Sequence, residues 1–363
     1  MTSEHNNPYV QKVEQSKNHV PTVFLYHDNQ IQDMVHFLKT AEEPRVGIDR
    51  TFNLGPFFAT TFVYKNQRVV RKETQEHPIF LGPVMLHKEA SYTVYHSFFS
   101  HISARLPVGL KNIDLRIPET MEFGSDAEKA LTKAIDDCFP NADRKLCTKH
   151  LKDNLSDYLK NRAGLTASER KSIMDKIFGD EGIVLANDTF DFEETSIALK
   201  DLATENKKFL NYFENHFKPN LLKYVCKPAD QLQKSWTNNN SESMNNILKL
   251  EIDWKPQNTP SLIEKITNVI KLQFLDLKRS LSGTGNYRLS GEYKKFKIAE
   301  TAYRSKSKEE RDQIFKKFLK ADLRKTSPVG LGRYIDISIN RDTVFHDTRI
   351  DSLELYRDIR THF

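Results

Sequence analysis

The sequence predicts an α/β fold in which a mixed sheet is covered by helices. Three strand-like segments follow one another in the first quarter of the 363-residue chain, and shorter strands then alternate with amphipathic helices. Consecutive strands can pair antiparallel, whereas strands separated by helices pair in parallel, so the combination gives a sheet of mixed direction. In the middle of the chain the strand signals vanish and helical periodicity dominates, which predicts a helical insertion.

Strand-forming residues dominate three consecutive segments, which together suggest an antiparallel meander. The predicted strands are 46–49, 57–64 and 79–86. Gly-Pro pairs bound or interrupt the second and third of them. A short helical pattern at 31–38 precedes the strands. Residues 1–28 are polar and mixed, and we expect them to form a loosely ordered N-terminal tail.

Strands and helices alternate in the next part of the chain. The predicted elements are, in order, a helix at 92–106, a strand at 121–123, a helix at 127–138, a strand at 144–147 and a helix at 149–160. Three strands followed by such alternation is the element order of the RNase H fold. We therefore expect an RNase H-like mixed sheet flanked by helices, with the first part of this core at 29–165.

Helical periodicity fills most of the remaining chain. Helices are predicted at 197–217, 241–250, 261–281 and 309–323. We therefore expect an all-helical insertion at 166–234, a catalytic helix at 235–255 that completes the core, and a basic helical C-terminal region at 256–363. Some strand character at 334–337 has no assigned place in this fold.

Charge and cysteine content limit the functional classes. The net charge is +6, and residues 278–325 hold 15 Lys and Arg against six Asp and Glu. Such a basic stretch suits a polyanion partner or an ordinary solvated helical face. Three scattered cysteines without a Cys-x-x-Cys pair exclude a disulfide framework and an autonomous zinc finger. The chain has neither a signal peptide nor a membrane-length apolar run, so we expect an intracellular protein with no membrane partner.

Two aspartates follow predicted strands. Asp49 ends an apolar run, where Asp is disfavoured, and is either a turn residue or a carboxylate raised on a rigid strand to hold a metal. Asp126 is either a metal ligand or part of a helix cap, since Ser125 and Glu128 fit a capping box. The two strands are neighbours in this fold, so both carboxylates could reach one cation.

A third acid, Glu242, lies at the start of a predicted helix. A carboxylate in the first helical turn is also favoured by the helix dipole, which is the alternative to a functional role. Glu251 is a competing candidate, but it lies more than two turns further along. Three such carboxylates suit two Mg²⁺ or Mn²⁺ ions, which prefer oxygen ligands and can activate an attacking oxygen while stabilising a leaving one.

Three segments resemble the transposase domain of Mutator-like elements (MULE), in particular its animal and fungal branch. The segments are GIDRTFNLGPFFATTFVYK at 47–65, FGSDAEKALTKAIDDCFPNADRKLCTKHLKDNL at 123–155 and TNNNSESMNNILK at 237–249. They occur in the order of that family, and the resemblance covers residues 30–255 apart from the helical insertion.

The resemblance implies a DDE-type transposase, which cleaves DNA strands and transfers them with two metal ions. Asp49, Asp126 and Glu242 take the positions of its catalytic and metal-binding triad, and Asp49 and Asp126 would bridge two Mg²⁺ or Mn²⁺ ions. Cys147 and His150 fall on the Cys-x-x-His of the family, near the active site. We favour a structural or DNA-positioning role for this pair over zinc binding, since two ligands do not make a zinc site.

The resemblance also implies partners and a location. The expected partners are double-stranded DNA, as transposon ends and target, and further copies of the chain in a homo-oligomer. Nicking at the terminal inverted repeats, followed by attack of the freed 3′-hydroxyl on target DNA, would take place in the nucleus. The residues expected to bind DNA are Trp236, Lys278, Arg279, Arg288, Lys294 and Lys295. Trp236, Tyr287 and Tyr293 could stack on bases, although burial is the more common fate of such side chains.

Three interpretations stay open at this point. Full-length relatives usually carry an N-terminal zinc-binding module and often a C-terminal SWIM-type zinc finger, and the sequence contains the Cys and His clusters of neither. The chain is a competent transposase core, a domesticated or decayed relative that binds DNA without catalysis, or an RNase H-like nuclease of another kind. The intact triad favours the first over the second, and the long insertion before Glu242 favours a transposase over compact nucleases.

Overall fold

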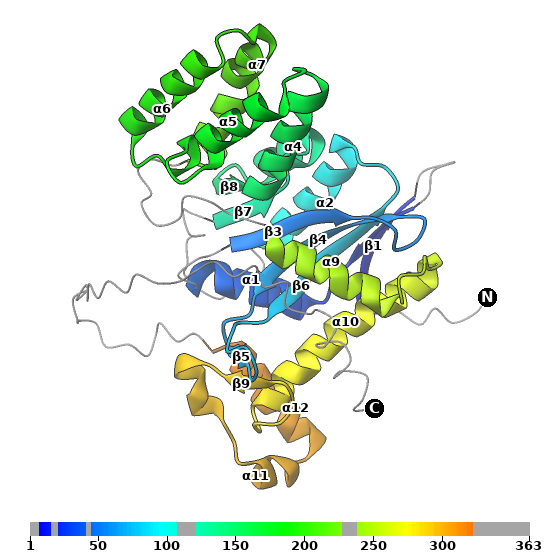
Figure 1. Cartoon of the computed structure of the whole chain (residues 1–363). Helices are drawn as coiled ribbons and strands as arrows, with labels where there is room; N and C mark the ends of the chain where they lie inside the picture. The colour runs from blue at the N-terminus through cyan, green and yellow to red at the C-terminus, as the bar shows by residue number, and fades with distance from the viewer. Residues whose placement is uncertain (1–6, 16–20, 41–44, 107–120, 227–237, 322–363) are drawn as a thin grey trace.

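A seven-stranded sheet runs through the centre of the molecule (Figure 1). The computed structural model describes residues 7–15, 21–40, 45–106, 121–226 and 238–321. In spatial order the strands are β1 (Val10–Glu14), β2 (Thr22–Leu25), β6 (Ile79–His87), β4 (Phe58–Lys65), β3 (Arg45–Thr51), β7 (Met121–Ser125) and β8 (Ala142–Leu146). Neighbours from β1 to β3 pair antiparallel, whereas β3, β7 and β8 pair in parallel. This mixed sheet with its helices confirms the predicted α/β fold class and is consistent with an RNase H-like core.

Helices cover both faces of this sheet. One face carries α1 (Asp28–Thr40), α2 (Tyr92–Arg105) and α3 (Lys129–Cys138), and the other carries α9 (Asn239–Glu251) and α10 (Thr259–Ser280). Val46 and Ile48 of β3 pack in the cluster of α1, α2 and α3. Because successive side chains of a strand point to opposite faces, Gly47 and Asp49 face α9.

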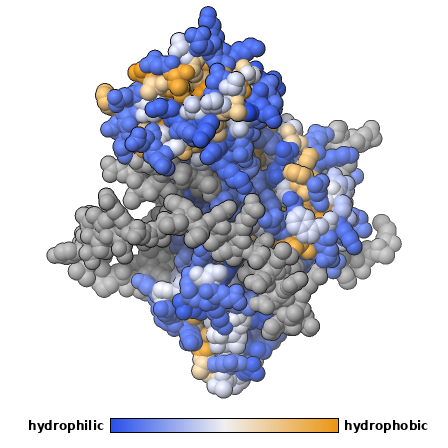
Figure 2. All heavy atoms as spheres, viewed as in Figure 1, coloured by the Kyte–Doolittle hydropathy of each residue, from blue (hydrophilic) through white to orange (hydrophobic). Residues whose placement is uncertain are grey.

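A helical part lies beyond the β8 edge of the sheet (Figure 1). It contains α4 (Thr148–Asn161), α5 (Ala167–Phe178), α6 (Thr189–Leu202), α7 (Lys207–Tyr212), a π-helical turn (Phe213–Phe217) and α8 (Lys218–Tyr224). These helices bury an apolar cluster of their own, which includes Leu151, Leu155 and Leu159 of α4. The helix predicted at 149–160 therefore packs with the helical part, whereas the sequence predicts it within the first part of the core, 29–165. In Figure 2 apolar residues gather on the surface of this part, and α6 exposes Phe190, Ile197 and Leu202.

The region after α10 is anchored to the core. Its elements are β9 (Tyr287–Leu289), a 3-10 helix (Gly291–Phe296), α11 (Glu300–Arg304) and α12 (Lys308–Leu319), and β9 pairs with β5 (Val69–Arg71) in a two-stranded sheet. Arg68, fully buried beside β5, lies 2.8 Å from Asp33 of α1 and donates a hydrogen bond to the carbonyl oxygen of Leu319. This region is therefore part of the folded body. None of the helices in the described segments has the length and apolarity required to cross a membrane.

Three sequence expectations differ from the structure. Strands β1 and β2 lie within the segment expected to be a polar tail; β1 is a partly exposed edge strand, so its sequence lacks an apolar run. The three-residue strands β5 and β9 are too short to give a periodic signal. Asp49 lies inside β3, two residues before the strand ends, and not at its last position. The strand character at 334–337 falls outside the described residues.

Candidate active site

Two acids come from neighbouring parallel strands. Strands β3 and β7 pair with Ile48 opposite Ser125, so the next residues along, Asp49 and Asp126, meet at the same edge of the sheet. Asp49 is 8% exposed, and its carboxylate accepts a hydrogen bond from the backbone N–H of Arg50 at 2.9 Å. The sheet register therefore brings these two residues side by side.

Helix α9 brings the third acid to the same edge. The amide of Asn245 donates a hydrogen bond of 2.7 Å to Oδ2 of Asp49, and Glu242 lies one turn earlier in the helix. The close approach of helix and strand depends on Gly47. A β-carbon at that position would lie 2.6 Å from Oγ of Ser241 and 2.8 Å from Cγ2 of Val63, closer than side chains tolerate. Glycine in this strand thus permits the helix to reach the acids.

Two basic residues from the first turn of α4 contact the acids. Nδ1 of His150 lies 2.7 Å from Oδ1 of Asp126, and its Nε2 lies 3.9 Å from Oε1 of Glu242. Nζ of Lys149 donates hydrogen bonds of 3.1 and 3.0 Å to the two oxygens of Glu242. The imidazole of His150 therefore lies between Asp126 and Glu242, and the half-exposed Lys149 holds Glu242 as well.

The electrostatic environment of the three acids favours the binding of positively charged groups. Burial, with a smaller effect from the negative charge of Asp126, raises the pKa of Asp49 to about 7. Hydrogen bonds from Arg50 and Asn245 and the charge of His150 act in the opposite direction. The adjacent carboxylate of Asp126 raises the pKa of His150 to about 10, with a smaller effect from Cys147. A desolvated acid beside a second acid binds a cation more readily than either acid alone.

The structure contradicts the capping interpretation of Asp126. Helix α3 begins at Lys129 with Glu128 at its N-cap, so Asp126 lies two residues before the cap. Glu128 accepts a hydrogen bond from the hydroxyl of Tyr95 at 3.0 Å and lies 3.1 Å from Arg50. The Ser125–Glu128 pattern is therefore not a capping box. Glu251, the competing candidate for the third acid, is the last residue of α9, whereas Asn245 contacts Asp49 from the turn that follows Glu242.

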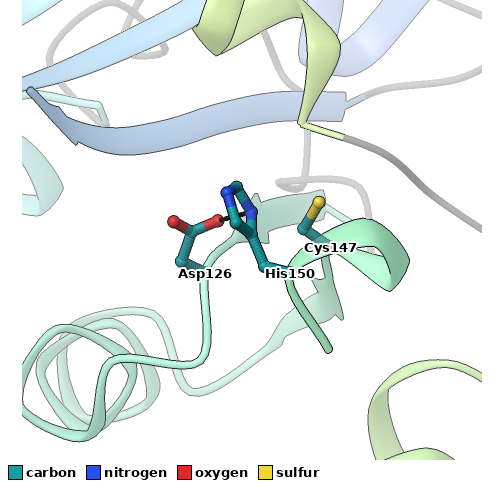
Figure 3. A group of neighbouring side chains, drawn as sticks. All are labelled: Asp126, Cys147 and His150. Carbon is teal, nitrogen blue, oxygen red and sulfur yellow. Dashed lines mark ion pairs between the residues drawn. The ribbon is translucent and has the colours of Figure 1, made fainter. Parts of the chain in front are cut away.

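One group at this site has the donor atoms of a metal centre. A carboxylate oxygen of Asp126, Sγ of Cys147 and a ring nitrogen of His150 lie within 4.8 Å of one another (Figure 3). In the described part of the chain, no other three His, Cys, Asp or Glu side chains meet this criterion. The acids Asp49, Asp126 and Glu242 therefore share one edge of the sheet without lying so close together.

The chain matches one known protein family. The model of the family described as "Transposase, Mutator family" matches residues 81–269, more than half of the sequence. The chain belongs to the Mutator family of transposases. No curated protein matches it. The matched region runs from β6 into α10 and contains Asp126, Cys147, His150 and Glu242, whereas Asp49 lies before it.

The residues expected to bind DNA in this transposase lie in different environments. Trp236 falls outside the described residues. Tyr287 and Tyr293 are buried in the main apolar cluster, so neither can stack on bases. Lys278 pairs with Asp312 at 2.5 Å and Arg279 with Asp276 at 3.3 Å, which reduces the positive charge that they offer. Arg288, Lys294 and Lys295 are exposed on β9 and the 3-10 helix that follows.

Four residues that build the candidate site are not indicated by the sequence patterns. Asn245 and Lys149 contact the acids, Gly47 permits the helix to approach, and the backbone N–H of Asn238 donates a hydrogen bond of 3.3 Å to Sγ of Cys147. A glycine within a strand is a signal of close backbone approach and could have pointed to Gly47. The other three depend on contacts between distant segments, which local patterns do not record.

Proposed function

We propose that this chain is the catalytic core of a Mutator-family DNA transposase, in which Asp49, Asp126 and Glu242 hold two divalent cations for strand cleavage and strand transfer. The observation that carries the proposal is the convergence of these acids from β3, β7 and α9 at one edge of the sheet. Residues so far apart in the sequence meet there only because the chain folds this way.

The donor set fits a hard cation. Asp49 and Asp126 repel each other, and the positive groups in contact with Asp126 and Glu242 come from His150 and Lys149. Oxygen ligands of this kind suit Mg²⁺ and Mn²⁺. Two such ions, when bound, would activate the attacking oxygen and stabilise the leaving oxygen of a phosphodiester. Asn245 orients Asp49 and the sheet fixes Asp126, so the protein orders two ligands in advance.

The substrate in this proposal is double-stranded DNA, first the transposon ends and then the target. Nicking releases a 3′-hydroxyl, which attacks the target strand at the same site. Exposed cations such as Arg288, Lys294 and Lys295 would contact the phosphate backbone, and binding should weaken as salt rises because condensed counterions are released. Under this proposal the protein would act on chromosomal DNA in the nucleus, as a homo-oligomer that holds two transposon ends.

The test is DNA cleavage and strand transfer with purified protein and Mg²⁺ or Mn²⁺. Loss of an outer ligand contact typically costs about 10–100-fold in a metal site, so Asp126→Ala, which removes a direct ligand, should cost at least about a hundredfold. Asp180→Asn, which changes an exposed acid of the helical part, is the matched control and should leave the rate unchanged.

Two other outcomes would replace the proposal. Folded protein that binds duplex DNA but cleaves with neither metal would be a non-catalytic relative. Cleavage that depends on Asp126, without joining of a supplied 3′-hydroxyl end to target DNA, would indicate a nuclease of this fold.

A further inference from the structure

We propose that Asp126, Cys147 and His150 form a binding site for a thiophilic divalent cation of the Zn²⁺ class, beside the hard-cation centre. The site shares Asp126 with that centre but does not depend on the cleavage reaction. It would place a transition metal at the corner where β7, β8 and α4 meet (Figure 3).

Local structure already gathers the three ligands. Cys147 directly follows β8 and is the N-cap of α4, and His150 lies in the first turn of that helix, so both side chains leave the same corner. Asp126 directly follows the neighbouring strand β7, which pairs with β8 up to Leu146. The three donor atoms lie within 4.8 Å of one another. Ligand atoms at about 2.0–2.3 Å from a tetrahedral ion lie roughly 3.3–3.8 Å from one another. Side-chain movements of about 1 Å would therefore bring the three donor atoms to the separations that a bound ion requires.

The donor types select the metal. Magnesium prefers oxygen ligands, whereas a thiolate with an imidazole and a carboxylate suits Zn²⁺ and related ions. Cys147 is 1% exposed, and its Sγ accepts a hydrogen bond from the backbone N–H of Asn238 at 3.3 Å. A hydrogen bond from a neighbouring N–H to the sulfur stabilises a metal-bound thiolate. On binding, the thiol proton of Cys147 would pass to the solvent, and the sulfur would bind as the thiolate.

The other two cysteines provide a contrast. The Sγ of Cys226 donates to the carbonyl oxygen of Ile183, and Cys138 lies against Ser100 and the carbonyl oxygen of His96. Neither belongs to a three-ligand group among the described residues. Among the three cysteines, Cys147 is thus the one with two further metal-ligating side chains beside it, Asp126 and His150. Three protein ligands leave the fourth position of a tetrahedral ion open, as in zinc sites that admit water or substrate.

Cobalt is the probe for the test, because Co²⁺ replaces Zn²⁺ and gives a strong near-ultraviolet band when a thiolate binds it. The whole chain, stripped by chelator, is titrated with Co²⁺. We expect a thiolate-to-Co²⁺ band that Zn²⁺ displaces and excess Mg²⁺ does not. Cys147→Ser should abolish the band and His150→Ala should weaken Co²⁺ binding at least about tenfold, whereas Cys226→Ser and Cys138→Ser should keep wild-type spectra.

Metal content gives an independent measurement. Wild-type protein dialysed against Zn²⁺ should retain one ion more per chain than Cys147→Ser, and circular dichroism establishes that the variant is folded. If Cys147→Ser does not fold, the same comparison is made with His150→Ala. A wild type without the thiolate band, or a band that persists in Cys147→Ser, overturns the proposal. Protein that shows the band but does not cleave DNA would contradict the proposed function alone.

Discussion

Two buried acids in this molecule have opposite surroundings. Asp33 accepts hydrogen bonds from Asn66 and from the guanidinium of Arg68, which lies 2.8 Å away and is itself fully buried. Asp49 is almost as buried, yet its hydrogen bonds come from an amide and a backbone N–H, and the nearest acid is Asp126. The fold supplies the counter-charge of Asp33, whereas Asp49 lies beside a second negative charge.

The difference separates a structural acid from a binding acid. A buried carboxylate with its own guanidinium is stable only as a pair, because either charge alone would be left without compensation. A buried carboxylate next to another is costly until a cation arrives from outside. Burial raises the pKa of both acids, but only Asp33 has a buried cation, Arg68, that depends on its charge. Removal of the charge should therefore destabilise the protein at Asp33 and stabilise it at Asp49.

The largest effect is expected at the structural pair. Asp33→Asn should lower the free energy of unfolding by about 3–5 kcal/mol, because Arg68 stays buried without its counter-charge. Denaturant unfolding followed by circular dichroism measures the change. The matched control is Glu300→Gln, which removes an exposed partner of Arg304 and should change stability by less than about 0.5 kcal/mol. Equal losses in the two variants would refute the distinction between buried and exposed pairs.

At Asp49 we expect the opposite sign. Without divalent metal and at pH 8, Asp49→Asn should raise the free energy of unfolding by about 1–4 kcal/mol, because the pKa of about 7 means that the ionised form is disfavoured in the fold. The same variant should lose metal-dependent cleavage under the proposed function. A variant that is less stable than wild type at pH 8 would show that the charge of Asp49 is compensated.

The pH dependence of that gain follows from linkage. The pKa of Asp49 rises from 3.8 to about 7 on folding, so between these values the folded state binds more protons than the unfolded state. Its contribution to stability is therefore full below pH 4 and lost as the pH rises to 7. The advantage of Asp49→Asn should accordingly shrink from pH 8 towards zero at pH 4. Unfolding midpoints of both proteins in chelator-containing buffers across this range would measure it, and a constant difference would contradict it.

A smaller effect is expected where α9 meets β3. Gly47→Ala should lower the free energy of unfolding by about 1–3 kcal/mol, because the new methyl group would overlap Ser241 and Val63. The displaced helix should also reduce cleavage, although no acid is changed. Ser241→Ala removes one of the two contacts, so it should restore part of the stability when combined with Gly47→Ala. A double variant no better than the single one would argue against this contact.

Much of the central sheet could be predicted because its buried strands differ in amino-acid composition from the segments around them. β4 and β6 read as apolar strand-forming runs, and Asp49 and Asp126 were visible as acids after apolar segments. The edge strand β1 could not be predicted, because two of its five residues are exposed and the other three are only partly buried, so its sequence resembles a loop. The strands β5 and β9 have three residues each and pair with each other, and segments of that length are too short to show the alternation of a strand in the sequence.

The sequence indicates which residues belong to the candidate site, but it does not indicate the contacts between them. The acids were identified from their place after strands and in a helix, whereas the link from His150 to Asp126 joins segments that only the fold brings together. The same holds for Arg68, whose partner lies 35 residues away and whose burial no local pattern indicates. Helical and strand periodicity report which face is buried, and they do not report what that face meets.

The smallest effect on stability is expected at Lys149. At this position a positive charge of the protein occupies the place where the proposal puts a metal ion. Its ammonium is about half exposed and holds Glu242, so it supplies a weak counter-charge where a metal ion would bind. Lys149→Gln should change the free energy of unfolding by less than about 1 kcal/mol. The same loss frees Glu242, so Mn²⁺ should bind about two- to five-fold more tightly, as measured by calorimetry. Lys152→Gln, an exposed lysine on the same helix, is the control and should leave Mn²⁺ affinity unchanged. Weaker Mn²⁺ binding in Lys149→Gln would mean that Lys149 prepares Glu242 for the ion and does not compete with it.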